Sequence, residues 1–225
     1  GRPYTFKFDE AEVEISITDD AGKIDINAAD AASLKNLFLG AGVEEQKADE
    51  LAGAIQDWRD PDDLTSLNGA ERADYRAVDL PYSPRNAPFE TLSEIQQVFG
   101  MDYDLYVQIE PAITMFSGRS SPSAAYAPME ALMAIPGMTP EQAQALIDQR
   151  QQLAPGLLNE GGAGLLLPDG SPLMADGGGL TYSIKSRATL PNGASTVLDA
   201  TIRLGGMNSA GRPYVVLRWR DGETA

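Results

Sequence analysis

The apolar residues of this chain repeat with a period of two at both ends and with a helical period between them. Residues 4–8 and 13–17 alternate between apolar and polar side chains, and the alternation returns in three stretches after residue 180, two of which flank the hairpin signal Pro191-Asn192-Gly193. Two short strands do not make a stable sheet alone. We therefore predict that the N-terminal strands pair with the C-terminal strands in one antiparallel sheet.

Helical spacing fills the middle of the chain. Predicted helices run from about residue 28 to Gly40, from about Glu44 to Trp58, from just after Pro88, and through a hairpin over residues 129–152. The sequence thus predicts an α+β fold in which residues 1–26 and 165–225 form a discontinuous sheet scaffold. Residues 27–164 form a large inserted α-helical domain. The glycine-rich residues 156–179 are predicted to be a flexible loop.

A repeat lies within the helical part. The segments Leu34–Leu37, Gly42-Val43 and Ala48–Leu51 align at a constant offset with Met129–Leu132, Gly137-Met138 and Ala143–Leu146, which predicts two copies of one helical hairpin. The stretch from Leu132 to Met138 is similar to the helix-hairpin-helix elements of DNA-binding proteins, so a helix-hairpin-helix binding module of unrelated role is an alternative function. The chain has 33 Asp and Glu against 17 Lys and Arg, a formal charge of −16, which repels phosphate. A packing role is therefore preferred and nucleic acid is not an expected partner.

Whole classes of catalysis are excluded by composition. The chain has no Cys and no His, so thiolate nucleophiles, zinc sites built on those residues and Ser-His-Asp triads are absent. Acidic residues are so abundant that a pair of them says nothing about acid–base catalysis. We expect a protein that is not an enzyme.

A long acidic stretch without regular periodicity follows the second predicted helix. Seven acids occur between residues 57 and 79 against three arginines, inside an irregular segment that runs from residue 60 to 88. Ca²⁺ takes six to eight oxygen ligands and orders loops of this kind. The Asp60-x-Asp62 spacing with a later Gly and Glu is calcium-like, although it does not match the EF-hand. The alternatives are a solvated acidic loop and pairing of the acids with Arg59, Arg72 and Arg76.

Five aromatic residues near the acidic stretch are interpreted as a local core beneath the loop rather than as a ligand cage. They are Trp58, Tyr75, Tyr82, Phe89 and Tyr103.

Three segments taken together resemble a known family. They are Ile24-Asp25-Ile26-Asn27-Ala28-Ala29 before a helix, the acidic loop with Asn68-Gly69-Ala70-Glu71, and Asn86-Ala87-Pro88-Phe89 followed by Leu92-Ser93-Glu94-Ile95. In this order they resemble the K-type minor pseudopilin of the bacterial type II (general) secretion pathway, over essentially the whole chain.

The resemblance implies a pseudopilin scaffold with an inserted helical domain that is associated with calcium. Its ligand set, carried over by position, is Asp60, Asp62, Asp63, Glu71 and Asp74, with Asp57 as a further candidate. Implied partners are the I-type and J-type minor pseudopilins in a heterotrimeric complex at the pseudopilus tip, with other pseudopilins and secreted substrates in addition. Family members begin with a prepilin leader and a hydrophobic helix that this sequence lacks. The resemblance therefore implies the periplasmic domain of a Gram-negative, inner-membrane-anchored protein that initiates pseudopilus assembly and supports protein export.

Overall fold

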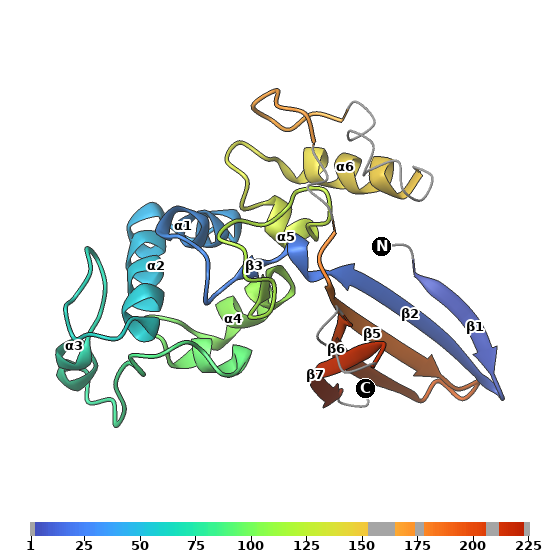
Figure 1. The fold of residues 1–225 in the computed structure, drawn as a ribbon, viewed down its shortest axis with the longest axis horizontal. Helices are drawn as coiled ribbons and strands as arrows, with labels where there is room; N and C mark the ends of the chain where they lie inside the picture. Colours follow the sequence, from blue (N-terminus) through green and yellow to red (C-terminus); the bar gives the residue numbers. More distant parts are fainter. Residues whose placement is uncertain (1–2, 153–164, 174–177, 206–211, 223–225) are drawn as a thin grey trace.

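A five-stranded antiparallel sheet joins the two ends of the chain (Figure 1). The computed structural model describes residues 3–152, 165–173, 178–205 and 212–222. The strands lie in the order β1-β2-β5-β6-β7, with bounds β1 (Tyr4–Phe8), β2 (Ala11–Asp19), β5 (Thr181–Thr189), β6 (Ser195–Leu204) and β7 (Tyr214–Asp221). The predicted pairing of N-terminal with C-terminal strands is confirmed, because β2 runs antiparallel to β5 with Ile17 opposite Ile184.

The two faces of this sheet differ sharply in polarity. The register places apolar side chains from every strand on one face, among them Tyr4, Phe6, Val13, Ile15, Ile184, Ala200, Ile202, Val216 and Trp219. Many of them stay accessible, and Trp219 is 60% exposed. The opposite, polar face is the one turned toward the helical part, since its Arg218 and Arg220 form ion pairs with Glu110 there.

The helical part holds most of the regular structure between β2 and β5. Its elements are η1 (Asp20–Gly22), β3 (Ile24–Asp25), α1 (Ala31–Gly40), α2 (Glu45–Arg59), α3 (Arg72–Ala77), η2 (Leu92–Gln97), α4 (Tyr103–Ile109), η3 (Glu110–Ala112), β4 (Ile113–Thr114), α5 (Met129–Leu132) and α6 (Pro140–Gln152). The hydrophobic core lies here: of the buried apolar residues, the five-stranded sheet contributes only Val13 and Ala200 among those described.

The predicted repeat has structural counterparts in both hairpins. Gly42 and Gly137 occupy equivalent turn positions with φ of +83° and +80°, a conformation that suits glycine. Thr139 and Gln142 form the reciprocal capping box that opens α6, with the Thr139 N–H donating to the Gln142 side chain at 2.9 Å and the Gln142 N–H donating back to the threonine hydroxyl at 3.3 Å. The hairpins contact each other through α1 and α5.

An arginine near the end of the second helix fixes each hairpin in the same way. Arg59 donates to the carbonyls of Ile26 and Ala29, in the segment before α1. Arg150 donates to the carbonyls of Ala124 and Ala127, before α5, at 2.8 and 2.9 Å. In both hairpins the two carbonyls stand three residues apart, so the guanidinium fork anchors the entry segment to the end of the hairpin.

Three predictions about the middle of the chain need correction. The stretch from residue 60 to 88 is not wholly irregular, since α3 occupies part of it. The element after Pro88 is a 3₁₀ helix, and α4 was not predicted. Part of the predicted flexible loop, residues 165–173, forms a tight turn with a Leu166–Pro172 bridge and a buried Leu173. The leucines around this turn anchor it to the core; residues 156–164 and 174–177 lie outside the described part.

The chain leaves the sheet and returns to it at one buried point. The Asp20 carboxylate accepts hydrogen bonds from Thr114 Oγ1 at 2.7 Å and from Ser183 Oγ at 2.6 Å, and it pairs with Lys23 at 3.3 Å. A single side chain thus ties the end of β2 to β4 and β5. Within the described residues, no helix has both the length and the apolar character to cross a membrane.

Candidate metal site

Helix α2 places the first acid of the loop inside the protein. Asp57 lies on the face of α2 that carries Gly53 and Ala54, and its side chain is fully buried. Both carboxylate oxygens accept from the Ser66 N–H, at 3.1 and 3.2 Å. A buried carboxylate needs such partners or a cation, because an ion removed from water is costly. Asp57 therefore pulls the loop back onto the helix that precedes it.

The Asn68-Gly69 turn forms the second wall of the site. Asn68 has a φ of +61°, and a Cβ at Gly69 would stand 2.0 Å from Asp57 Oδ2. A Cβ at Gly53 on α2 would meet the backbone of this turn at 2.8 Å. Glycines at both positions let the turn lie directly on α2 above the Asp57 carboxylate. This close approach of the turn to α2 is the steric reason for the Asn68-Gly69 pair in the sequence motif.

Two acids of the predicted set carry buried oxygens without partners. Glu71 is 3% exposed and stands at the N-cap of α3, where its carboxylate faces the first backbone N–H groups of the helix, yet neither oxygen makes a hydrogen bond of good geometry with a described residue. Asp60 Oδ1 is also buried and unpartnered. Unsatisfied buried carboxylate oxygens are rare in native proteins and call for an explanation such as an ion. A bound cation is one arrangement that would satisfy these oxygens.

The electrostatics of the two acids agree with that reading. Burial, followed by the nearby charge of Asp57, raises the pKa of Glu71 to about 6. Burial, followed by the charges of Asp62 and Asp57, raises the pKa of Asp60. Mutual repulsion of carboxylates in a partly desolvated site is relieved when a divalent cation binds between them.

The other predicted ligands are held at the margin of this site. Asp62 is exposed and accepts from the Leu64 N–H at 2.9 Å. Asp63 accepts from the Asn86 side-chain amide at 3.0 Å. Asp74 caps α3 by accepting from the Glu71 N–H at 2.8 Å. Asp60 and Glu71 lie within electrostatic range of Asp57. Asp62, Asp63 and Asp74 instead shape the loop through their hydrogen bonds.

Neither of the simpler interpretations of the loop accounts for the buried acids. In the described part of the chain, Arg59, Arg72 and Arg76 form no ion pair with an acid of the loop, and Arg59 is used on carbonyls instead. Nor does any group of three acidic side chains among the described residues form a metal cluster by itself. Ca²⁺ accepts backbone carbonyls and water as well as carboxylates. The residues fit a cation that Asp60 and Glu71 bind, with Asp57 close by and loop oxygens completing the shell.

Two asparagines hold the loop in place and were not predicted to do so. The Asn27 side chain donates to the Phe89 carbonyl at 3.0 Å and accepts from the Phe89 N–H at 2.8 Å. Asn86, at a φ of +53°, donates to the Asp62 carbonyl at 2.8 Å. Both lie in the family-like segments of the sequence, which was the one signal that could have found them.

An aromatic cluster supports the site from below, as predicted. Trp58 stacks on Phe89 with ring centroids 6.0 Å apart and meets Tyr75 at 6.2 Å. Tyr75 contacts Tyr82 and Phe99, and its hydroxyl accepts from the Phe99 N–H at 2.7 Å. The inclusion of Tyr103 was wrong: this residue begins α4 and is 66% exposed.

Fold and site together define an α+β protein in which a helical region, with an oxygen-rich acidic loop, is carried between strands of one antiparallel sheet. Comparison with known families identifies it further. Residues 15–118, which include the whole acidic loop, match the family model described as type II secretion system (T2SS), protein K. Nearly half of this chain is thus similar to the type II secretion system protein K family.

Curated relatives match the same region. Type II secretion system protein K of Pectobacterium carotovorum subsp. carotovorum is 33% identical over 126 residues, which cover 53% of this chain and 37% of the relative. The Klebsiella pneumoniae protein of that name is 30% identical over 121 residues, covering 48% and 37%. The matches thus span little more than a third of the length of these relatives.

A solved structure matches the fold over nearly the whole chain. A chain in the crystal structure of the GspK-GspI-GspJ complex from the enterotoxigenic Escherichia coli type 2 secretion system superimposes with a TM-score of 0.67. The match covers 99% of this chain and 84% of that chain at 20% identity. At this identity the similarity establishes the shared fold.

Proposed function

We propose that this chain is the periplasmic part of a minor pseudopilin that caps the tip of the type II secretion pseudopilus. It assembles there with the I-type and J-type minor pseudopilins, initiates pseudopilus assembly and so supports protein export. The observation that carries the proposal is the fold, which matches a chain of a GspK-GspI-GspJ complex over nearly its full length. The match of residues 15–118 to the protein K family model agrees with it. The role is structural, not enzymatic.

The architecture supports a capping role in a simple way. The helical region between β2 and β5 is much larger than the sheet and stands beside it (Figure 1). A domain of this bulk on one subunit blocks the stacking of another subunit above it, which defines an end. The apolar face of the sheet, turned away from the helical region, is free to contact neighbouring subunits.

Assembly is tested by mixing this chain with the soluble domains of the I-type and J-type partners from the same organism. We expect one ternary species by size-exclusion chromatography with light scattering. Trp219→Ser on the exposed apolar face is expected to weaken it, whereas Leu67→Ser, at a side chain 89% exposed on the distant acidic loop, is not. Three folded components that elute separately at all concentrations would refute the proposed assembly.

We also propose that the acidic loop binds Ca²⁺ as a structural ion, which orders a segment with little regular structure of its own. The support is the buried oxygens without a well-placed partner, which are one oxygen of Asp60 and both oxygens of Glu71. A ligand that binds only the native state raises the unfolding midpoint. In EGTA-treated protein, we expect Ca²⁺ to raise the midpoint and Mg²⁺, which prefers a smaller and more rigid site, to do so much less.

Two variants and one control make the calcium test specific. Asp60→Ala and Glu71→Ala should each abolish the response to Ca²⁺. Asp79→Asn removes an exposed acid of the same stretch at a position of φ +59° that asparagine tolerates, and it should respond as the parent chain does. An equal response from all three variants, or none from the parent chain, would show that the loop is only an acidic surface.

A further inference from the structure

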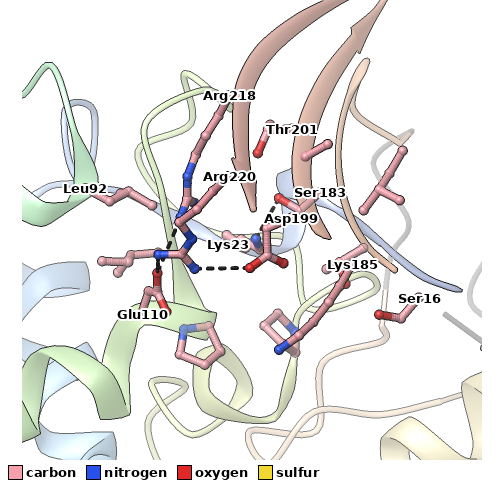
Figure 2. A pocket seen from close by; sticks show the side chains of 16 residues that line it. Ser16, Lys23, Leu92, Glu110, Ser183, Lys185, Asp199, Thr201, Arg218 and Arg220 are labelled. Atoms are coloured by element: carbon pink, nitrogen blue, oxygen red, sulfur yellow. Dashed lines mark hydrogen bonds and ion pairs between the residues drawn. The ribbon is translucent and has the colours of Figure 1, made fainter. Parts of the chain in front are cut away.

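A polar hollow lies between the sheet and the helical region, on the side of the molecule away from the acidic loop. It has a volume of about 230 Å³ and is partly open to solvent. The polar face of β2, β5, β6 and β7 forms one wall, and Glu110, Pro111 and Pro128 from the helical region form the other. Figure 2 shows Lys185 and Arg220 reaching into this space from the strands and Glu110 facing them.

Two rows of side chains cross the wall that the sheet provides. The strand register sets Thr18 opposite Ser183, Ser183 opposite Thr201, and Thr201 opposite Arg218. The next row along the strands runs in the same way through Ser16, Lys185, Asp199 and Arg220. Side chains of one row stand about 5 Å apart on a sheet. Hydroxyls and cations therefore form a regular grid of hydrogen-bond donors facing the hollow.

Several of these donors have no partner. Thr201 is 3% exposed, and its hydroxyl, which makes no hydrogen bond to a described residue, is open to the hollow and not sealed in the core. The same holds, within the described ranges, for the side chains of Ser16, Thr18 and Lys185. By contrast Ser183 donates to Asp20 at 2.6 Å. Hydroxyl and ammonium groups that line a hollow without a protein partner bind water or a ligand there.

The charge of the hollow points to the kind of ligand. Two cations, Arg218 and Arg220, already hold the carboxylate of Glu110 at 3.5 and 3.2 Å, and Arg220 also pairs with Asp199 at 3.1 Å. Lys185 remains unpaired beside them among the described side chains. In a chain with a net charge of −16, a site that presents a free ammonium group and free hydroxyls strongly favours an anion over a cation.

We propose that this hollow is a carboxylate-binding site. Lys185 supplies the charge and the Thr201 and Thr18 hydroxyls supply hydrogen bonds, in the way that the neighbouring arginines hold Glu110. The carboxylate comes from a small organic acid or from an acidic side chain of a protein docked at the junction. The proposal is independent of the tip function and of the acidic loop.

The test is an NMR titration of the intact chain at constant ionic strength, following the backbone amides of Lys185 and Thr201. The probes are succinate, N-acetylglutamate amide, its neutral glutamine analogue, and inorganic phosphate. We expect saturable shifts with at least one of the two carboxylate probes and none with the glutamine analogue. Succinate binding alone indicates a free acid as ligand, and binding of the glutamate amide indicates a docked side chain.

Variants separate the site from general electrostatics. Lys185→Met, at an exposed position that tolerates change, should weaken binding roughly tenfold, and Thr201→Val should weaken it several-fold. Lys7→Met removes a cation from the same face of the sheet at β1, outside the hollow, and should leave the affinity unchanged. Shifts that never saturate, equal losses in Lys7→Met, or phosphate binding as tight as that of the carboxylates would overturn the proposal.

Discussion

Asn27 joins two segments that lie 62 positions apart in the sequence by means of its side chain alone. Its amide donates to and accepts from the backbone of Phe89, as a neighbouring strand residue would. The preceding Asp25 is buried and accepts from the N–H groups of Asn27 and Gly118 at 2.9 and 2.7 Å. Together the two polar side chains fix the entry to α1 and the end of the acidic stretch.

Replacing Asn27 with alanine should therefore destabilise the fold far more than a surface change does. Two buried backbone groups of Phe89 would lose their partner, at a cost of about 2–4 kcal/mol in the free energy of unfolding. Urea denaturation measures this cost. Asn36→Ala, on α1 and without a described side-chain hydrogen bond, serves as the control and should cost less than about 0.5 kcal/mol. Similar midpoints for the two variants would contradict the role given to Asn27.

Glu71 gives the metal-free chain an unusual dependence on pH. Its folded pKa of about 6 lies above the ordinary value of 4.5, so between these pH values the folded state holds a proton that the unfolded state has lost. The free energy of unfolding must then fall as pH rises through this window, by about 2 kcal/mol from this group. The loss is complete above pH 6, where the folded carboxylate is charged.

Glu71→Gln should remove that slope. In EGTA the variant is expected to be more stable than the parent chain at pH 7 by about 1–2 kcal/mol and to match it near pH 4.5, because a neutral amide carries no buried charge. In Ca²⁺ the order should reverse. Thermal unfolding at a series of pH values measures both effects, and parallel profiles for the two proteins would show that Glu71 is not desolvated.

At the scale of elements, the contact between the two helical hairpins depends on a glycine. A Cβ at Gly40 of α1 would lie 2.5 Å from the Met133 carbonyl oxygen and 2.9 Å from the Ala134 nitrogen, at the end of α5. Backbone atoms cannot rotate away as a side chain can. The repeated hairpins therefore pack as closely as they do because α1 ends in a residue without a side chain.

Gly40→Ala should change the free energy of unfolding through two effects of opposite sign. Alanine favours a helix over glycine by about 1 kcal/mol, whereas overpacking against backbone costs about 1–3 kcal/mol. We expect the clash to dominate and the unfolding midpoint to fall. In Gly53→Ala the new Cβ would meet the backbone of the Asn68-Gly69 turn at 2.8 Å, so the unfolding midpoint should fall there as well. The same clash should weaken the response to Ca²⁺. A stabilised Gly40→Ala variant would show that α1 and α5 are loosely packed.

Elements that span several turns or several alternations could be predicted from the sequence, and the shortest ones could not. The periodicity of β5, β6, α2 and α6 is carried by many side chains. In contrast α3 has six residues, and the parallel pair of β3 and β4 has two residues on each strand, Ile24 opposite Ile113 and Asp25 opposite Thr114. Such elements exist because tertiary contacts hold them, and no local pattern reveals them.

The candidate site was predictable in composition but not in arrangement. The sequence shows an acidic loop, and any of its acids could be a ligand on that ground. Only the structure separates Asp60 and Glu71, which carry buried oxygens without a well-placed partner, from Asp74, whose carboxylate accepts from the Glu71 N–H. Burial is decided by residues far along the chain, such as Phe89 and Phe99, so local spacing does not contain it.

At the scale of the whole molecule, the sheet and the helical region meet through polar contacts. Asp20 is 1% exposed and holds β2, β4 and β5 together. The ion pairs of Glu110 lie along the same boundary between the sheet and the helical region, here called the seam. Polar seams of this kind fix a geometry because each buried group must keep its partner.

Asp20→Ala should accordingly loosen the junction. The change leaves Lys23 without its counter-ion and two hydroxyls without their acceptor, and we expect a loss of about 3 kcal/mol or more. Calorimetry should show a broadened or divided transition as the sheet and the helical region unfold separately. Asp49→Ala, which breaks a partly exposed ion pair with Lys35, should cost less than about 1 kcal/mol and leave one transition. A single unshifted transition in Asp20→Ala would show that the seam does not couple the two parts.

The same topology sets an order of events during synthesis. Asp20 and Ser183, which bond across the seam, are 163 positions apart, so β2 leaves the ribosome long before β5 exists. The N-terminal hairpin must wait, with one edge unpaired and Tyr4, Phe6 and Phe8 accessible, while the whole helical region is made. The β1–β2 hairpin is thus most exposed to wrong pairing while β5 is still missing, and a chaperone that shields β2 would act on the slowest step of folding.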